Sequence, residues 1–139
     1  MAYCIHIIAH GHDYWLIEMT RRCPGDLYSL LIQFSTGYPY AASYVAPFVG
    51  REPIGLNDNE VKEFVTRHTV TSESGAALWG FSFGGPVDIP LFVPLATSGD
   101  FIEPSPYGRA GVLFLRSPDR NAQDVLYRRL ISGKFYSFT

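Results

Sequence analysis

The sequence predicts an α+β protein: a single domain over residues 1–139, with a mainly antiparallel sheet and about three helices. Two observations predict this class. The length of 139 residues fits one domain of ordinary size. Strand-like and helix-like segments follow one another in the order ββ-α-α-β(ββ)-α-β, which is not the regular alternation of a doubly wound parallel sheet.

The first twenty residues predict a β-hairpin. From Ala2 to His10 the side chains alternate with the period of two that a strand has. Gly11-His12-Asp13 is a turn sequence, and residues 14–21 resume β-favouring types.

A first helix is expected after Pro24-Gly25-Asp26. Four apolar residues have the i, i+3, i+4, i+7 spacing of one helical face. They are Leu27, Leu30, Leu31 and Phe34. Gly37 and Pro39 are expected to end this helix.

A second helix is expected from Asn57 onward. Asn57 fits an N-cap, and Glu60 stands three residues later, where a capping-box partner belongs. The helical spacing then places four side chains on the inner face. They are Val61, Phe64, Val65 and His68.

Residues 69–116 predict strands and turns, with strands over 77–83, 87–95 and 109–116. Pro90 and Pro94 lack the N–H that a central strand needs, so this segment is expected to be an edge strand or an extended loop. Ser117-Pro118 then indicates the start of a third helix, which Gly133 ends. Residues 135–138 are expected to add a short last strand.

Charge and composition restrict the classes of partner. Eleven Lys and Arg against thirteen Asp and Glu give a net charge of −2, which argues against a nucleic-acid partner. The chain shows no signal peptide, and its densest apolar stretch, Val87 to Ala96, is broken by a charge and two prolines. We therefore expect a cytoplasmic protein without a membrane span. Whether Cys4 and Cys23 are bridged stays open.

One hydrolase-like motif lacks its structural context. Gly80-Phe-Ser-Phe-Gly84 has the G-x-S-x-G pattern of a nucleophile elbow, which requires a following helix and a later histidine. Gly85-Pro86 cannot begin a helix, and no histidine follows His68. Ser82 is therefore interpreted as a strand residue among glycines that admit neighbouring backbone. The doublets Arg21-Arg22 and Arg128-Arg129 are interpreted as solvated ends of elements.

Cys23 and His68 form the alternative catalytic hypothesis. Cys23 precedes the first predicted helix, where the helix dipole favours a thiolate. His68, at the end of the second predicted helix, would act as its base in a small hydrolase, transferase or toxin. The competing interpretation is a buried structural cysteine and a histidine stabilised at a helix end.

Histidines near the turn of the hairpin suggest a weaker metal hypothesis. Only His10 and His12 could share one ion through the turn, because successive strand residues lie about 3.3 Å apart. Histidines that merely form hydrogen bonds are the alternative. We predict no cofactor.

The aromatic content supports the leading functional hypothesis. Nine Tyr, ten Phe and two Trp make up 15% of the chain, more than one small core is expected to hold. The charge-free segment 36–50 carries Tyr38, Tyr40, Tyr44 and Phe48. Such rings give large contact area at low entropy cost, so these four predict an interface. We therefore expect a non-catalytic protein that contacts a protein partner or itself, as an assembly subunit, self-associating module or inhibitor.

Overall fold

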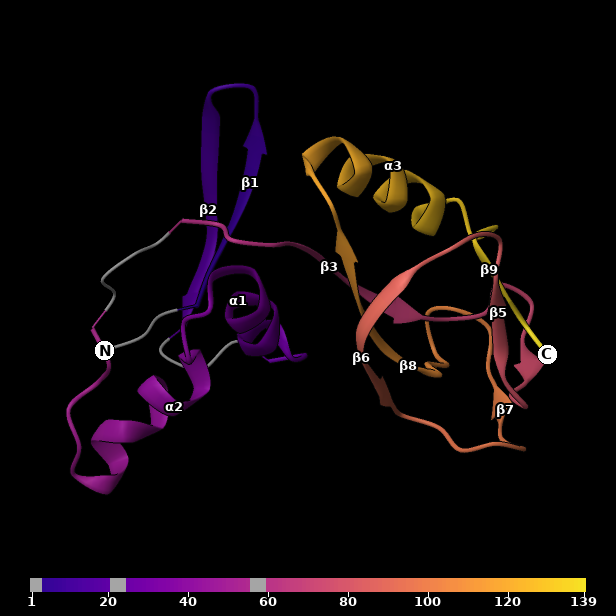
Figure 1. Cartoon of the computed structure of the whole chain (residues 1–139), viewed down its shortest axis with the longest axis horizontal. Coiled ribbons are helices and arrows are strands. Elements are labelled where there is room, and N and C mark those ends of the chain that lie inside the picture. The colour runs from indigo at the N-terminus through magenta and orange to yellow at the C-terminus, as the bar shows by residue number, and fades with distance from the viewer. Residues whose placement is uncertain (1–3, 21–24, 56–59) are drawn as a thin grey trace. The chain divides into compact units, whose positions relative to one another are not determined.

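The computed structural model describes residues 4–20, 25–55 and 60–139 (Figure 1). It confirms the α+β class, with three α-helices and antiparallel pairing between all the named strands of the described residues. The contacts group the chain into two compact units, Met1–Glu60 and Val61–Thr139. The organisation of residues 1–139 as a single domain stays a prediction.

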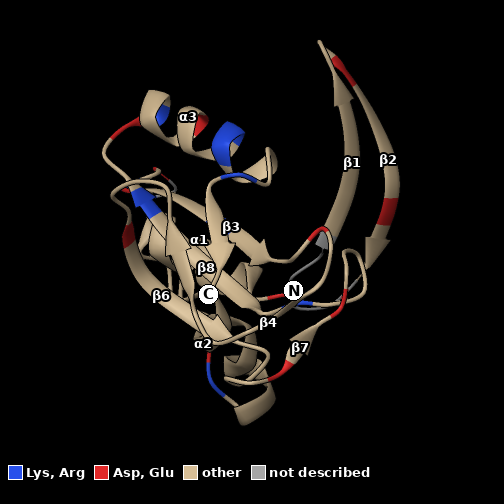
Figure 2. Cartoon of the chain, turned by 90° about the vertical axis from the view of Figure 1, so that its right-hand side faces the viewer, with Lys and Arg blue, Asp and Glu red and all other residues tan. Residues whose placement is uncertain are grey.

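The first unit begins with the predicted hairpin. Strands β1 (Cys4–His10) and β2 (Asp13–Thr20) pair antiparallel around a turn in which Gly11 has a positive φ of 61°. The register passes from His6–Glu18 to Ile7–Leu16, so Ile17 is an extra residue on β2 and forms a bulge. Strand β1 contains no Lys, Arg, Asp or Glu, whereas β2 contains the carboxylates Asp13 and Glu18 (Figure 2).

Two α-helices follow the hairpin in the first unit. Helix α1 (Tyr28–Thr36) confirms the first predicted helix and ends at Gly37, whose left-handed backbone places its N–H on the Gln33 carbonyl at 2.8 Å. The charge-free segment forms the short helix α2 (Tyr40–Val45) and the 3-10 helix η1 (Ala46–Val49).

The second unit is built on the three-stranded sheet β3 (Phe64–Val70), β8 (Gly111–Ser117) and β6 (Asp88–Pro94), in the order β3-β8-β6. The position of β6 at one edge confirms the interpretation of its two prolines. The second unit also contains two short two-stranded sheets. They are β4 (Ala76–Ala77) with β7 (Phe101–Ile102), and β5 (Phe81–Phe83) with β9 (Tyr136–Phe138).

The predicted helix over 57–68 is wrong where the structure describes it. Residues 57–59, which carried the capping signal, lie outside the described residues, and the following segment forms β3. Val65, Thr66, Thr69 and Val70 are β-branched, which favours a strand. Pairing with the buried strand β8 along the full length of β3 therefore overrides the helical spacing.

Helix α3 (Arg120–Ile131) confirms the third predicted helix, but its cap lies two residues later than expected. Ser117 is the last residue of β8, and Asp119 caps the helix by accepting a hydrogen bond from the Ala122 N–H at 2.8 Å. Gly133, with a φ of 70°, follows the end of the helix as predicted. None of the helices in the described residues has the length and apolar character that crossing a bilayer requires.

The core of the second unit lies where α3 packs on the sheet. Val70, Leu113 and Leu115 have no exposed surface, and Leu130 of α3 is 2% exposed. An aromatic cluster borders this core, with ring centroids 5.1 to 6.4 Å apart between neighbours. It consists of Phe81, Phe83, Phe92, Phe135, Tyr136 and Phe138. The second unit thus holds a packed interior that can position side chains at its surface.

Candidate functional site

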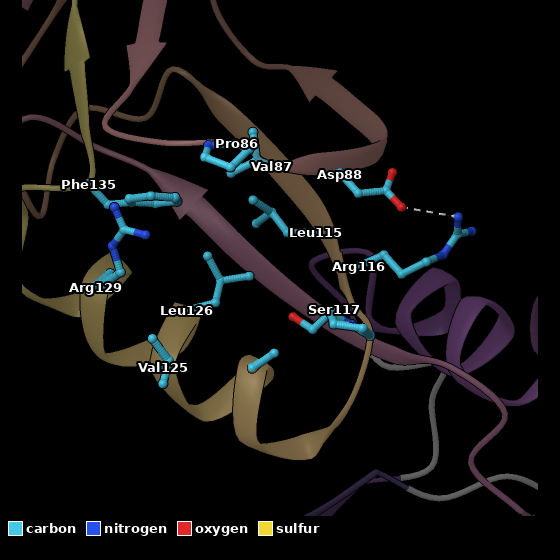
Figure 3. Close-up of a pocket in the computed structure, with 12 residues that line it drawn as sticks. Pro86, Val87, Asp88, Leu115, Arg116, Ser117, Val125, Leu126, Arg129 and Phe135 are labelled. Atoms are coloured by element: carbon cyan, nitrogen blue, oxygen red, sulfur yellow. Dashed lines mark hydrogen bonds and ion pairs between the residues drawn. The ribbon is translucent and has the colours of Figure 1, made fainter.

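The first candidate site is an open hollow of about 540 Å³ in the second unit, which we call the arginine hollow (Figure 3). It lies between the start of β6, the end of β8 and α3. Its walls are largely apolar, with Val87, Leu115 and Leu126 between the two ends. This volume is within the range of roughly 300 to 1,000 Å³ found for small-molecule sites.

Arg129 and Phe135 form one end of the arginine hollow. The Arg129 guanidinium carbon lies 4.2 Å from the centre of the Phe135 ring, a cation–π contact. Arg129 Nη2 also donates a hydrogen bond to the Gly84 carbonyl at 3.0 Å. The guanidinium is therefore held by a ring and by a backbone carbonyl, while its side chain stays exposed.

Arg116 and Asp88 form the other end of the arginine hollow. Arg116 Nε lies 2.6 Å from Glu63 Oε2, and Nη1 lies 3.4 Å from Asp88 Oδ2. The hydrogen bond that Arg116 donates to Glu63 is the main cause that raises the pKa of Arg116. Two carboxylates thus compensate this cation.

The second candidate site is an open hollow of about 610 Å³ in the same unit, which we call the histidine hollow. It contains His68 and Tyr136, and Glu73 lines it as well. Five hydroxyl side chains contribute to its walls. They are Thr71, Ser72, Ser74, Ser105 and Ser137. The histidine hollow is therefore more polar in its chemistry than the arginine hollow.

Tyr136 connects His68 to the backbone of Thr71. The Tyr136 hydroxyl donates to the Thr71 carbonyl at 3.1 Å and accepts from the Thr71 N–H at 3.1 Å. The hydroxyl oxygen also lies 3.2 Å from His68 Nε2, and it accepts a hydrogen bond there when this nitrogen carries the proton of the neutral imidazole. Burial, and then the nearby charge of Arg67, lower the pKa of His68, which favours this neutral form.

In the first unit, Glu18 is the most distinctive polar group. It lies beside the bulge of β2, and its Oε1 is 3.0 Å from Nδ1 of His6, its cross-strand partner. Bulges are frequent next to active sites, because they change the direction in which a strand side chain points. Both side chains are about half exposed, so they are accessible to a ligand.

The structure contradicts the predicted helix-end placement of His68 and does not test that of Cys23. Cys23 lies outside the described residues. His68 is in β3 rather than at a helix end, and its ring lies against Tyr136. Ser82 lies in β5, as interpreted from sequence, with its Oγ 3.2 Å from Ser137 Oγ.

The structure shows no third ligand for a metal ion at His10 and His12 among the described residues. His10 ends β1 opposite Asp13, and His12 lies in the hairpin turn. Among the residues that the structure describes, no group of three or more His, Cys, Asp or Glu side chains is arranged to hold an ion. Binding of an ion by these two histidines stays a prediction.

The four residues of the predicted interface differ in their environments. The Tyr38 hydroxyl donates to the Ile54 carbonyl at 2.9 Å and contacts Ser43, which ties α2 to the segment after η1. Tyr40 and Tyr44 are half-buried, whereas Phe48 is 75% exposed. Tyr38 therefore has a structural role of its own, and the interface of these four residues stays a prediction.

Sequence reasoning missed Arg129, Phe135 and Glu18 as candidate site residues. Arg129 was interpreted as part of a solvated doublet, although the Gly84-Gly85 pair already indicated close approach of another group. Phe135 and Glu18 had no sequence signal, because the first depends on tertiary packing and the second on a bulge.

The fold as a whole is one that also forms part of an enzyme. No family model and no curated protein matches the chain. Among solved structures, it is similar to phosphoribosylglycinamide synthetase from Anaerococcus prevotii, with a TM-score of 0.70 and 14% sequence identity. The match covers 99% of this chain but 36% of that chain, so the chain spans about a third of the enzyme's length.

This likeness corrects the functional hypothesis from sequence. The prediction of a non-catalytic interaction protein is wrong, because almost the entire chain has the fold of a segment of an enzyme. The likeness does not test the alternative pair, Cys23 and His68, because Cys23 lies outside the described residues.

Proposed function

We propose that this chain is one part of an amide-forming synthetase, with the rest of the catalytic site supplied by protein outside these 139 residues. The observation that carries the proposal is the match of 99% of the chain to phosphoribosylglycinamide synthetase at a TM-score of 0.70. The name of that enzyme's product describes an amide. The missing part would come from the same polypeptide or from a protein partner, in the cytoplasm.

The side chains of the described residues are consistent with a contribution to a larger site. These side chains line two open hollows in the second unit, and in the first unit Glu18 and His6 form an exposed pair. Within the described ranges there is no cluster of three metal-ligating side chains, and the one motif serine is paired with another serine. Such a chain supplies binding surfaces and single polar groups, and a complete reaction requires further residues.

The proposal is tested on the assembled protein. The polypeptide or complex that contains this chain is isolated from its source through a tag on the chain. It is then supplied with glycine, a nucleoside triphosphate and a panel of primary amines, and amide products are detected by mass spectrometry. We expect an amide that forms only with the triphosphate present. An assembly that forms no amide and cleaves no triphosphate with any amine contradicts the proposal.

Glu18 provides a sharper version of this test. We propose that the exposed carboxylate of Glu18 contributes its charge to the assembled site, so Glu18→Gln is expected to lower the rate of amide formation about tenfold or more. Glu52→Gln is the matched control, since Glu52 is an exposed carboxylate of the same unit and is expected to leave the rate unchanged. Equal rates for the two variants would remove Glu18 from the site.

A further inference from the structure

We propose that the arginine hollow binds a small ligand in which a carboxylate or phosphate group is attached to an apolar body, with Arg129 receiving the anionic group. This inference concerns the second unit alone and does not depend on the proposed synthetase function. It rests on the orientation of Arg129, on the charge around it and on the walls of the hollow.

The guanidinium of Arg129 is oriented before any ligand arrives. The Phe135 ring lies under it at 4.2 Å, and the Gly84 carbonyl accepts one of its N–H groups at 3.0 Å. The backbone of Gly85 also approaches the guanidinium closely, because this residue has no side chain. A Cβ atom at Gly85 would lie 3.3 Å from Nη2 and 3.6 Å from Nη1. A cation held in this way loses little further freedom when it binds an anion.

The charge of Arg129 is not compensated by the protein residues that are described. No carboxylate in the described ranges lies within ion-pair distance of it, whereas Arg116 at the opposite end is paired with Glu63 and Asp88. A guanidinium carries five N–H donors in a planar fork that matches a carboxylate or a phosphate. An incoming anion is therefore expected at Arg129 and not at Arg116.

The walls of the hollow require an apolar body on the ligand. Val87 and Leu126 line the space between its two ends, and the fully buried Leu115 forms its floor (Figure 3). A bare inorganic anion would leave this surface in contact with water, so burial of an apolar group adds to binding. The volume of about 540 Å³ suits a small molecule.

Three probes of one shape test the ligand class on the full chain. Phenylacetate carries a carboxylate, phenyl phosphate carries a phosphate, and phenylacetamide is the uncharged counterpart of the first. Binding is followed by NMR through the Arg129 Nε–H signal and the methyl signals of Leu115 and Leu126. We expect saturable shifts at these signals with at least one anion, at an affinity about tenfold or more above that of phenylacetamide. The anion that binds more tightly identifies the preferred group.

Substitutions at two neighbouring arginines provide a matched comparison. Arg129→Gln is expected to weaken binding of the preferred anion about tenfold or more. Arg128→Gln removes the same charge from the same helical turn, but Arg128 does not line the hollow, so its effect is expected to stay below about twofold.

Two milder variants retain a cation at the site. Arg129→Lys keeps the charge but loses the planar fork, and Gly85→Ala pushes a methyl group toward the guanidinium. Both variants are expected to weaken anion binding several-fold while the backbone NMR spectrum stays unchanged. If Arg129→Gln fails to fold, these two variants test whether Arg129 binds the anion. The proposal is overturned if neither anion shifts the three signals at millimolar concentration. It is equally overturned if phenylacetamide binds as tightly, if Arg128→Gln causes the same loss, or if both milder variants bind normally.

Discussion

At the scale of single residues, Arg129 shows how a side chain's role depends on neighbours far away in the sequence. Gly84 and Gly85 are more than forty positions earlier, yet their backbone lies against the guanidinium. The sequence indicated that the glycines around Ser82 admit neighbouring backbone, and the Phe135 carbonyl does approach Gly84, but the group nearest Gly85 is the Arg129 side chain. The sequence did not indicate this group, because the approach of α3 to this turn is a product of tertiary packing.

His68 is a second residue whose environment differs from the predicted one. It was expected at a helix end, where a positive charge is favoured. In β3 it is half-buried beside Tyr136, and Arg67 is its chain neighbour. Both factors disfavour the charged imidazole, so the pKa is lowered instead of raised.

This lowered pKa predicts a loss of stability in acid. Above the ordinary histidine pKa of about 6.5, His68 is neutral in both the folded and the unfolded protein, so its environment does not lower the free energy of unfolding. As the pH falls below that value, the unfolded chain binds a proton before the folded protein does, so the free energy of unfolding decreases. Urea titrations between pH 7.5 and pH 5 check this. His68→Gln is expected to reduce the decrease, and an identical decrease in the variant would contradict the assignment.

At the scale of elements, the sequence predicted those whose signals are local. The hairpin over β1 and β2, helix α1 with its end at Gly37, and the edge position of β6 are confirmed. Turn residues, glycine at a helix end and proline in a strand act through the local backbone, which explains this success.

The segment predicted wrongly is β3, whose secondary structure depends on pairing with the distant strand β8. Phe64, Val65 and His68 fit a helical face, but they also fit a strand that pairs with β8 about fifty residues later. The sequence contains both signals, and only the pairing decides between them. The cap of α3 is a smaller case, since Ser117 precedes a proline but is buried as the end of β8.

The observed cap of α3 yields a prediction about stability. Asp119→Ala removes the acceptor of the Ala122 N–H and is expected to lower the free energy of unfolding by about 1 kcal/mol. Asp124→Ala is the control on the same helix, because its ion pair with Arg120 is exposed at 3.4 Å and is expected to contribute less than about 0.5 kcal/mol. Chemical denaturation of both variants measures the difference. Equal losses would show that Asp119 does not act as the cap.

At the scale of the whole molecule, composition indicated an aromatic surplus but not its use. Six rings gather in the cluster beside the core of the second unit, while Phe48, Trp79 and Tyr107 are 70% or more exposed. The surplus is therefore divided between interior and surface. A ring count cannot distinguish a free interaction module from a segment of an enzyme, because both expose apolar side chains to other protein.

The two units are expected to differ in local stability. Strand β8 is bonded on both sides and carries fully buried side chains, whereas β1 and β2 form a two-stranded sheet with exposed apolar side chains. Hydrogen exchange of the isolated chain is expected to be slower in β8 than in the hairpin by about a hundredfold or more. Equal protection of the two regions would contradict this difference and would indicate that the hairpin is covered in the isolated chain.

The prolines of β6 have a consequence for solubility during synthesis and storage. Strand edges recruit strands from other molecules, and apolar edges such as Ile89 to Val93 are typical starting points for fibrils. Pro90 and Pro94 offer no amide hydrogen to an incoming strand, so self-templated growth is interrupted twice along this edge. Replacing them would turn the same strand into an aggregation site without altering any residue of the two hollows.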